Sequence, residues 1–401
     1  MNILDELRGT LALGGNIRIM AVRALITETC FGMFYVVWQP YVIELGATLP
    51  QLGLVQGVML LFAAVGSLVW GRLSDGWGRK PAAVGSIVCR AVALVFCFAA
   101  REWVSFVGFG VFMGLSASWQ QNNPAISALM AESVDEERVG TAVSVIMSLG
   151  MMASISTASL GGYLALKDGY QLIFLSCIAG EMFNAVLYST RLRETLDRDA
   201  LTAKPAEDWL RGLVDFLRPE AGLLPFYVAA VIGSVSYGLS NSILYGLLVD
   251  SFGFNTVQLG LMSTLFGLSW GLSQMPVGWL MDRFGRKPFL LLSQIASMAV
   301  MAGYFLSRDF AVFLLLQAIS GLGHAMWIPA QIAMVTERVP TGRRSSAIGK
   351  LSTFPMLFGI PAPYIGGLIY EAFGFGTPML IRLLSLAVSF VIILVFVKET
   401  K

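Results

Sequence analysis

Long apolar segments alternate with short polar ones along the chain of 401 residues. A helix needs about 20 mostly apolar residues to cross the hydrocarbon core of a bilayer, and the pattern predicts twelve such spans. They cover residues 19–45, 51–71, 82–101, 104–131, 141–166, 171–190, 223–250, 256–281, 288–306, 311–336, 344–370 and 376–397. The connecting segments are short, so neighbouring helices are expected to be antiparallel and adjacent. We therefore predict an all-α integral membrane protein.

One strongly charged stretch, residues 191–222, divides the spans into two groups of six. We interpret it as a solvated cytoplasmic linker or surface helix. The predicted organisation is a six-helix bundle over residues 1–190, this linker, and a second six-helix bundle over residues 223–401.

The two halves repeat one pattern. Residues 71–81 read GRLSDGWGRKP and residues 278–288 read GWLMDRFGRKP, each where one apolar run ends and the next begins. The tetrapeptide QLGL also occurs twice, at 51–54 and 258–261. Parallel repeats of this kind build one class of membrane transporter, and they predict two pseudo-symmetric bundles.

Composition and charge support this interpretation. The chain is 56% hydrophobic and 13% charged, against about 25% charged residues in an ordinary soluble domain. Apart from Arg90 and Arg382 within spans, only Arg101, Lys167 and Arg308 fall on the outer side if the N-terminus is inside. The positive-inside rule then places both termini in the cytoplasm. A net charge of +2 gives no general attraction to nucleic acid.

The duplicated loop resembles the signature of the major facilitator superfamily, G-x-L-x-D-[RK]-x-G-R-[RK]-[RK]. In that family the signature lies between spans two and three and again between spans eight and nine, where both copies fall here. The second copy matches the pattern as far as Lys287, whereas the first has Gly76 where a basic residue is usual. The resemblance extends over the whole chain through span number, two halves and central linker.

The resemblance implies a cytoplasmic gate that holds the outward-open state. Its predicted members are the acids and bases of the two loops and the charges that follow spans four and ten: Asp75, Arg79, Glu132, Arg138, Asp282, Arg286, Glu337 and Arg343. Such pairs can form and break between packed bundles. The alternative is an interfacial charge cluster that only fixes the topology.

The resemblance also implies that spans one, four, seven and ten line a central substrate cavity. Residues three and four apart share one face of a helix, and on that basis the candidates are aromatic and amide side chains. They are Tyr35, Trp38, Gln39, Trp119, Gln120, Asn123, Tyr237, Asn241, Tyr245, His324, Trp327 and Gln331. The alternative for each is interhelical hydrogen bonding or aromatic packing in the core.

Few charged residues lie within spans. Glu28 lies in the first span, on a helix that the resemblance places at the cavity, and burial of a carboxylate favours its protonated form. We therefore expect Glu28 to couple transport to protons. Arg90 and Glu181 lie on helices that are peripheral in this family, so they are expected to pair with each other.

We predict a secondary active transporter of the plasma (inner) membrane, rather than an enzyme, that exports amphipathic or cationic compounds in exchange for protons. The branch resembled is that of short bacterial drug exporters, but its GPxxGG motif is replaced by TASLGG at residues 157–162. Proton symport or uniport of a small polar solute for uptake therefore stays open. Few fixed charges in the predicted cavity argue against strongly anionic substrates. The pattern indicates no cofactor and no metal; the expected partners are a small-molecule substrate, protons and the lipid bilayer, and one chain contains both halves, so a monomer would suffice.

Overall fold

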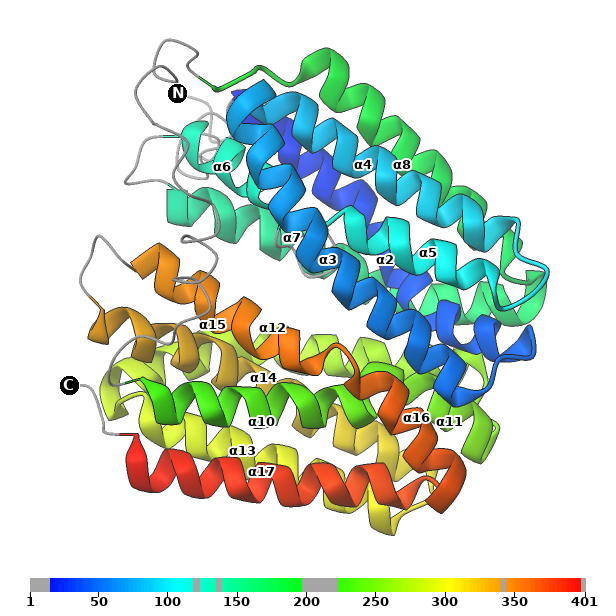
Figure 1. Cartoon of the computed structure of the whole chain (residues 1–401), viewed down its shortest axis with the longest axis vertical. Helices are drawn as coiled ribbons and strands as arrows, with labels where there is room; N and C mark the ends of the chain where they lie inside the picture. The colour runs from blue at the N-terminus through cyan, green and yellow to red at the C-terminus, as the bar shows by residue number, and fades with distance from the viewer. Residues whose placement is uncertain (1–14, 118–122, 135–138, 197–222, 340–343, 398–401) are drawn as a thin grey trace. The chain divides into compact units, whose positions relative to one another are not determined.

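A computed structural model describes residues 15–117, 123–134, 139–196, 223–339 and 344–397. The chain falls into two compact units (Figure 1). Unit 1 contains residues 1–46 and 58–204, and unit 2 contains residues 47–57 and 205–401. The boundary between the two predicted bundles and their linker stays a prediction.

Unit 1 is built of helices that run back and forth. They are α2 (Gly15–Glu44), most of α3 (Leu49–Trp77), α4 (Arg79–Phe98), α5 (Ser105–Leu115), α6 (Pro124–Glu132), α7 (Val139–Asp168) and α8 (Gln171–Arg191). Helix α2 packs against α7 and α8, and α4 packs against α8 and α5. Their apolar faces form a core that includes Ile17, Ile87 and Tyr188, which are fully buried.

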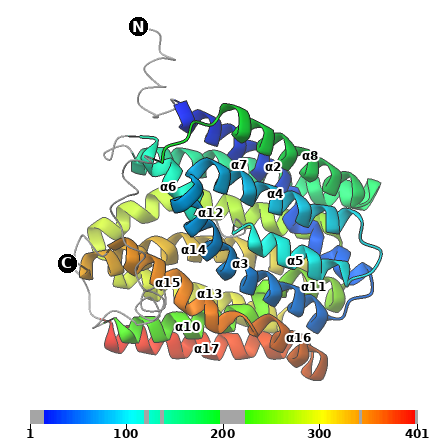
Figure 2. The ribbon, with the colours of Figure 1, turned by 45° about the horizontal axis from the view of Figure 1, so that its top comes forward.

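Unit 2 repeats this plan with some helices broken into segments. It contains α10 (Leu224–Ser240), η3 (Asn241–Ile243), α11 (Leu244–Phe252), α12 (Thr256–Phe284), α13 (Lys287–Leu306), α14 (Phe310–Arg338), α15 (Arg344–Gly359), α16 (Ala362–Phe373) and α17 (Gly376–Phe396). Helix α10 packs beside α17, as Figures 1 and 2 both show. Helices α12 and α13 pack against α14.

The all-helical membrane fold is confirmed. In the part of the chain that the structure describes, 10 helices are long and apolar enough to cross a membrane. The predicted fourth span appears as α5 and α6, with residues 118–122 outside the described ranges. The start of α6 has a local cause, because the Asn123 side chain accepts hydrogen bonds from the N–H groups of Ala125 and Ile126 and Pro124 occupies the first helical turn. The predicted eighth span corresponds to α12, which is 29 residues long.

Glycines at matching places of the repeat allow close helix contacts in both units. A Cβ atom at Gly161 of α7 would overlap the backbone of Met33 in α2, and one at Gly366 of α16 would overlap the backbone of Leu239 in α10. These glycines belong to the paired Gly-Gly positions of the two halves. Helices in lipid associate through van der Waals packing of small residues, so this spacing depends on the absence of side chains.

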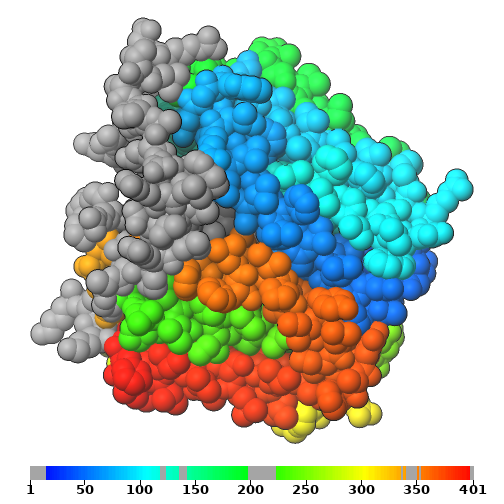
Figure 3. Space-filling view, in the orientation of Figure 1, coloured from blue at the N-terminus to red at the C-terminus, as the bar shows by residue number. Residues whose placement is uncertain are grey.

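The outer faces of the helices are apolar. On α17, which lies on the surface of unit 2 in Figure 3, Leu384, Val391 and Phe396 are all more than half exposed. On α8 of unit 1, Leu172, Phe183 and Val186 are equally exposed. A soluble protein rarely exposes apolar patches of this extent, whereas a bilayer solvates them.

Replacing Gly161 with alanine is expected to destabilise unit 1 by about 1–3 kcal/mol, because the added methyl group overpacks the contact between α2 and α7. The measurement is the thermal-unfolding midpoint of the purified protein in detergent. Gly233→Ala in α10 is the matched control, since a Cβ atom there meets nothing within 4 Å and alanine favours the helix. Equal midpoints for the two variants would contradict the proposed packing.

Candidate functional site

Each unit carries one charge cluster at the signature loop. In unit 1 the Arg79 guanidinium pairs with Asp75 and, at 3.0 Å, with Glu132 of α6. In unit 2 Arg286 pairs with Asp282 at 2.8 Å and with Glu337 of α14 at 3.4 Å. The same three helices of each repeat are thus joined by one arginine. Arg138 and Arg343, the other predicted gate residues, lie outside the described residues.

The signature glycines have backbone conformations that other residues rarely adopt. Gly78 has φ 124° and Gly285 has φ 92°. Positive φ carries little penalty for glycine alone, and at these points the chain turns from one helix into the next. The two turns place Arg79 and Arg286 at the start of α4 and just before α13, where each can reach the acid at the end of the preceding helix.

The chain after α8 is tied to the first charge cluster, a contact that the sequence did not reveal. The Glu194 carboxylate accepts hydrogen bonds from the backbone N–H groups of Arg79 (2.8 Å) and Lys80 (3.1 Å). The Thr195 hydroxyl donates to Glu132 at 2.6 Å. Asn16 of α2 holds the same segment through both backbone groups of Arg193. Glu194 therefore caps the positive N-terminal end of α4.

A buried ion pair joins three helices of unit 1. Arg90 Nη2 of α4 lies 2.8 Å from Glu181 Oε2 of α8, and the two side chains are 4% and 0% exposed. Thr27 of α2 donates to the other oxygen of Glu181 at 3.0 Å and accepts from Arg90 at 3.3 Å. Asn184 donates to the same threonine hydroxyl at 2.9 Å. The predicted pairing of Arg90 and Glu181 is present, and Thr27 connects it to α2.

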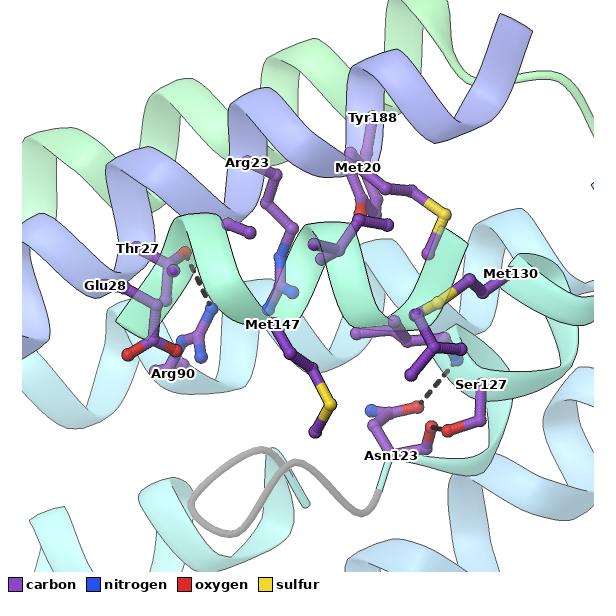
Figure 4. A pocket seen from close by; sticks show the side chains of 15 residues that line it. Met20, Arg23, Thr27, Glu28, Arg90, Asn123, Ser127, Met130, Met147 and Tyr188 are labelled. Atoms are coloured by element: carbon purple, nitrogen blue, oxygen red, sulfur yellow. Dashed lines mark hydrogen bonds between the residues drawn. The ribbon is translucent and has the colours of Figure 1, made fainter. Parts of the chain in front are cut away.

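A cavity of about 210 Å³ lies beside this pair within unit 1. Figure 4 shows its polar lining, to which α2 contributes Arg23 and Glu28 and α4 contributes Arg90. Asn123 at the start of α6 also lines it, with apolar side chains such as Met147 between the polar groups. Three of the residues selected from the sequence, Glu28, Arg90 and Asn123, therefore surround one cavity.

The remaining cavity candidates of α2 do not line this cavity. Trp38 is fully buried and its ring lies 5.6 Å from that of Phe109, so it contributes to the core of unit 1. Gln39 is also buried, whereas Tyr35 is 44% exposed. Trp119 and Gln120 lie outside the described residues. Within unit 1 the cavity is thus lined by the half of α2 nearer the N-terminus.

The candidates in unit 2 lie among aromatic rings. The His324 ring contacts Phe266 edge-on at 5.0 Å, and its Nδ1 lies 2.9 Å from the Ser320 carbonyl oxygen. Tyr237 packs under the buried Arg382 guanidinium, 4.9 Å from its ring centre. The remaining candidates differ in burial: Tyr245 is buried, and Asn241, Trp327 and Gln331 are partly buried. Trp327 packs against the core of unit 2.

Sequence comparison identifies the class of protein to which this architecture belongs. The sequence model of the Major Facilitator Superfamily matches residues 20–241 and 226–401. The chain belongs to the Major Facilitator Superfamily, so it is a multi-pass membrane protein with the fold of a transporter of small molecules.

Similar sequences include a multidrug resistance protein and a multidrug efflux pump. The chain is 22% identical to the multidrug resistance protein MdtG of Citrobacter koseri over 90% of its own length and 89% of that protein. It is 28% identical to the multi-drug resistance efflux pump PmrA of Streptococcus pneumoniae, but that match covers only 38% of this chain and 39% of the pump.

Solved structures share the fold at lower identity. The nucleoside transporter NupG superposes with a TM-score of 0.73 at 14% identity, covering 96% of this chain and 98% of NupG. A D-xylose-proton symporter superposes with a TM-score of 0.73 at 17% identity, covering 96% of this chain and 99% of the symporter. These likenesses establish the architecture and carry no information about the substrate.

Replacing Glu194 with glutamine is expected to weaken the cap on α4 by about 1 kcal/mol or less, because the carboxylate is exposed. Partial burial raises the pKa of Glu194, but hydrogen bonds from four backbone N–H groups outweigh it and hold the pKa below the usual 4.5. The stabilisation is therefore present above about pH 4.5 and is lost as the pH falls through the lowered pKa. Thermal midpoints measured across this range should decline less in Glu194→Gln than in the wild type. The exposed Glu371→Gln is the control, and an identical decline in all three proteins would contradict the cap.

Replacing Glu181 with glutamine is expected to destabilise the protein by about 3–5 kcal/mol, since it leaves the buried Arg90 charge without its partner. The double variant Arg90→Gln/Glu181→Gln removes both charges and should recover part of that loss. Thermal unfolding of the two singles and the double variant in detergent measures the coupling. If the stability losses of the two single variants add up to that of the double variant, there is no coupling energy between Arg90 and Glu181.

Proposed function

We propose that the chain is a proton-coupled secondary transporter of the plasma membrane, with both termini in the cytoplasm. The observation that carries this proposal is the place of Glu28 in the cavity of unit 1, beside Arg23 and Arg90. The charges of both arginines act on Glu28, so a change in its protonation alters the field at the place where a substrate would sit. Ionisable residues inside a membrane are costly and commonly serve proton relays.

We further propose that transport proceeds by alternating access, with the two charge clusters at the signature loops acting as the cytoplasmic gate. Each cluster is held by one arginine between two carboxylates, which suits a contact that forms and breaks. Glu194 and Thr195 tether the chain leaving α8 to the first cluster. This tether supports a gate in which that segment follows the movement of unit 1.

Two observations favour different directions of transport. Export of amphipathic compounds is supported by the relationship to MdtG and PmrA. Proton symport, the alternative from the sequence, is supported by the two guanidinium groups in the cavity, which disfavour a cationic substrate next to Glu28. The sign of the proton flux separates the two directions.

Glu28→Gln is expected to abolish substrate-triggered proton movement, because glutamine cannot exchange a proton. The purified protein is reconstituted into liposomes that contain a pH-sensitive dye, and lipophilic cations, aromatic carboxylates, sugars and amino acids are added in turn. Proton entry together with a substrate indicates symport, and movement in opposite directions indicates antiport.

The control for this experiment is Glu102→Gln, an exposed glutamate that does not line the cavity. It should retain wild-type flux. Substrate flux without proton movement, equal in the wild type and Glu28→Gln, would reject proton coupling through Glu28 and leave a uniporter or another coupling ion.

A further inference from the structure

The cavity in unit 1 is expected from the sequence to bind cations, but two arginines line it. The charged groups in and around it are Arg23 and Glu28 from α2, Arg90 from α4 and Glu181 from α8. Tyr188 of α8 adds a phenol to the lining. The residues that α6 and α7 contribute, such as Asn123, Ser127 and Gly150, carry no charge. Two cations therefore face two carboxylates, one of which is already committed to a buried pair.

Charge balance changes when Glu28 takes up a proton. With Glu28 ionised, the two arginines and two carboxylates sum to zero. With Glu28 protonated, the pair of Arg90 and Glu181 still balances, and the charge of Arg23 is left without a counter-charge. An unpaired charge in a low-dielectric site is costly, so the protonated cavity favours the entry of one negative charge. A cation would be repelled by this excess in the protonated state and would find no excess negative charge in the ionised state.

Hydrogen-bonding capacity points the same way. The Nε atoms of Arg23 and Arg90 are buried and have no hydrogen-bond partner among the residues that the structure describes. Arg90 is only 3% exposed, and its partnered nitrogen is Nη2, which donates to Glu181. Figure 4 shows Arg23 extending from α2 towards Met147, and Arg90 beside Glu28. A carboxylate offers two acceptor oxygens, and guanidinium groups bind it with paired, charge-assisted hydrogen bonds.

The rest of the lining suits an apolar body. Met20, Met130 and Met147 surround the polar groups together with Ile126 and Ile146. Methionine side chains are flexible and polarizable, so they adapt to ligands of different shape. The cavity thus combines an anion-binding wall with an adaptable apolar wall.

We propose that this cavity binds the carboxylate of a small amphipathic monoanion between Arg23 and Arg90 while Glu28 is protonated. This inference rests on the proposed role of Glu28 as the proton site. Because the ionised Glu28 competes with the substrate carboxylate for the same arginines, proton and anion bind together. Binding that is mutually favourable moves both in one direction, so the inference assigns proton–anion symport.

The test uses three probes with one ring system and different charge: 2-naphthoate, 2-naphthamide and 2-naphthylmethylammonium. Equilibrium binding to the purified full-length protein is measured between about pH 5 and about pH 8, a range in which buried carboxyl groups can titrate. Naphthoate should bind more tightly than the other two, and its affinity should rise as the pH falls. In Glu28→Gln its affinity should be high and independent of pH.

Arg23→Gln should weaken naphthoate binding by roughly tenfold to a hundredfold, as expected for the loss of a hydrogen bond to a charged group. Naphthamide binding should fall much less, because the neutral amide forms no ion pair with Arg23, and an unchanged thermal-unfolding midpoint reports that the variant is folded. Arg18→Gln is the matched control, since Arg18 is an exposed residue of the same helix.

Tighter binding of the ammonium probe, no naphthoate binding at any pH, or an unchanged naphthoate affinity in Arg23→Gln would overturn the inference. If any of these outcomes is found while proton flux is lost in Glu28→Gln liposomes, anion binding is rejected and the proposed proton-coupled transport still stands. Naphthoate binding that depends on Arg23 but not on pH, with flux retained in Glu28→Gln, would instead reject Glu28 as the proton site.

Discussion

The ion pair of Arg90 and Glu181 constrains the rest of unit 1. Both charges are removed from water, and burial of an ion is tolerated only when partners satisfy it. Thr27 and Asn184 supply the additional hydrogen bonds, so α2, α4 and α8 must meet at one depth. That meeting point sets which part of α2 faces the cavity. Thr27 faces the pair, and its neighbour Glu28 and the residue one turn earlier, Arg23, face the cavity beside it. A structural ion pair and a candidate binding site therefore share Arg90.

Sharing Arg90 also limits what the cavity can do. Its guanidinium cannot turn fully towards a ligand, because Glu181 and Thr27 hold one nitrogen, and the Phe31 ring lies 5.1 Å from the guanidinium carbon. Among the described residues no salt bridge involves Arg23, whose guanidinium carbon lies 5.8 Å from the centre of the Tyr188 ring. Arg23 is thus the adjustable cation of the site and Arg90 the fixed one. Glu28 is on the same helix as Arg23, and both side chains line the cavity.

The sequence predicts the fold well because its signals are local. Long apolar runs define the spans, and the duplicated loop predicts the two clusters, since Asp75 and Arg79 are four residues apart on one turn. Side-chain roles that depend on helix phase and on distant segments are harder to predict. The sequence predicts that Trp38 lines the cavity because it belongs to an aromatic stripe on one helix face, but its ring is in the core. The sequence places Arg23 near the cytoplasmic end of a span that is predicted to begin at residue 19. In the structure α2 already begins at Gly15, so Arg23 lies within the helix. The contacts of Asn16 and Glu194 join segments that no spacing rule connects.

The two halves of the repeat share their helix contacts and signature loops but differ in their buried charges. The arginine of the signature loop and the glycines of the close helix contacts recur in both units, so the repeat preserves the elements that shape and hold each bundle. The buried charges do not recur. Counted from the signature arginine, the position of Arg90 in the first copy corresponds to Ser297 in the second. Unit 2 instead has Arg382 against Tyr237, with no acid paired to it among the salt bridges of the described residues. A buried carboxyl group beside two cations is therefore a property of unit 1. This asymmetry is expected if one half holds the proton site, because a second buried acid would add a desolvation cost without a substrate charge to balance it.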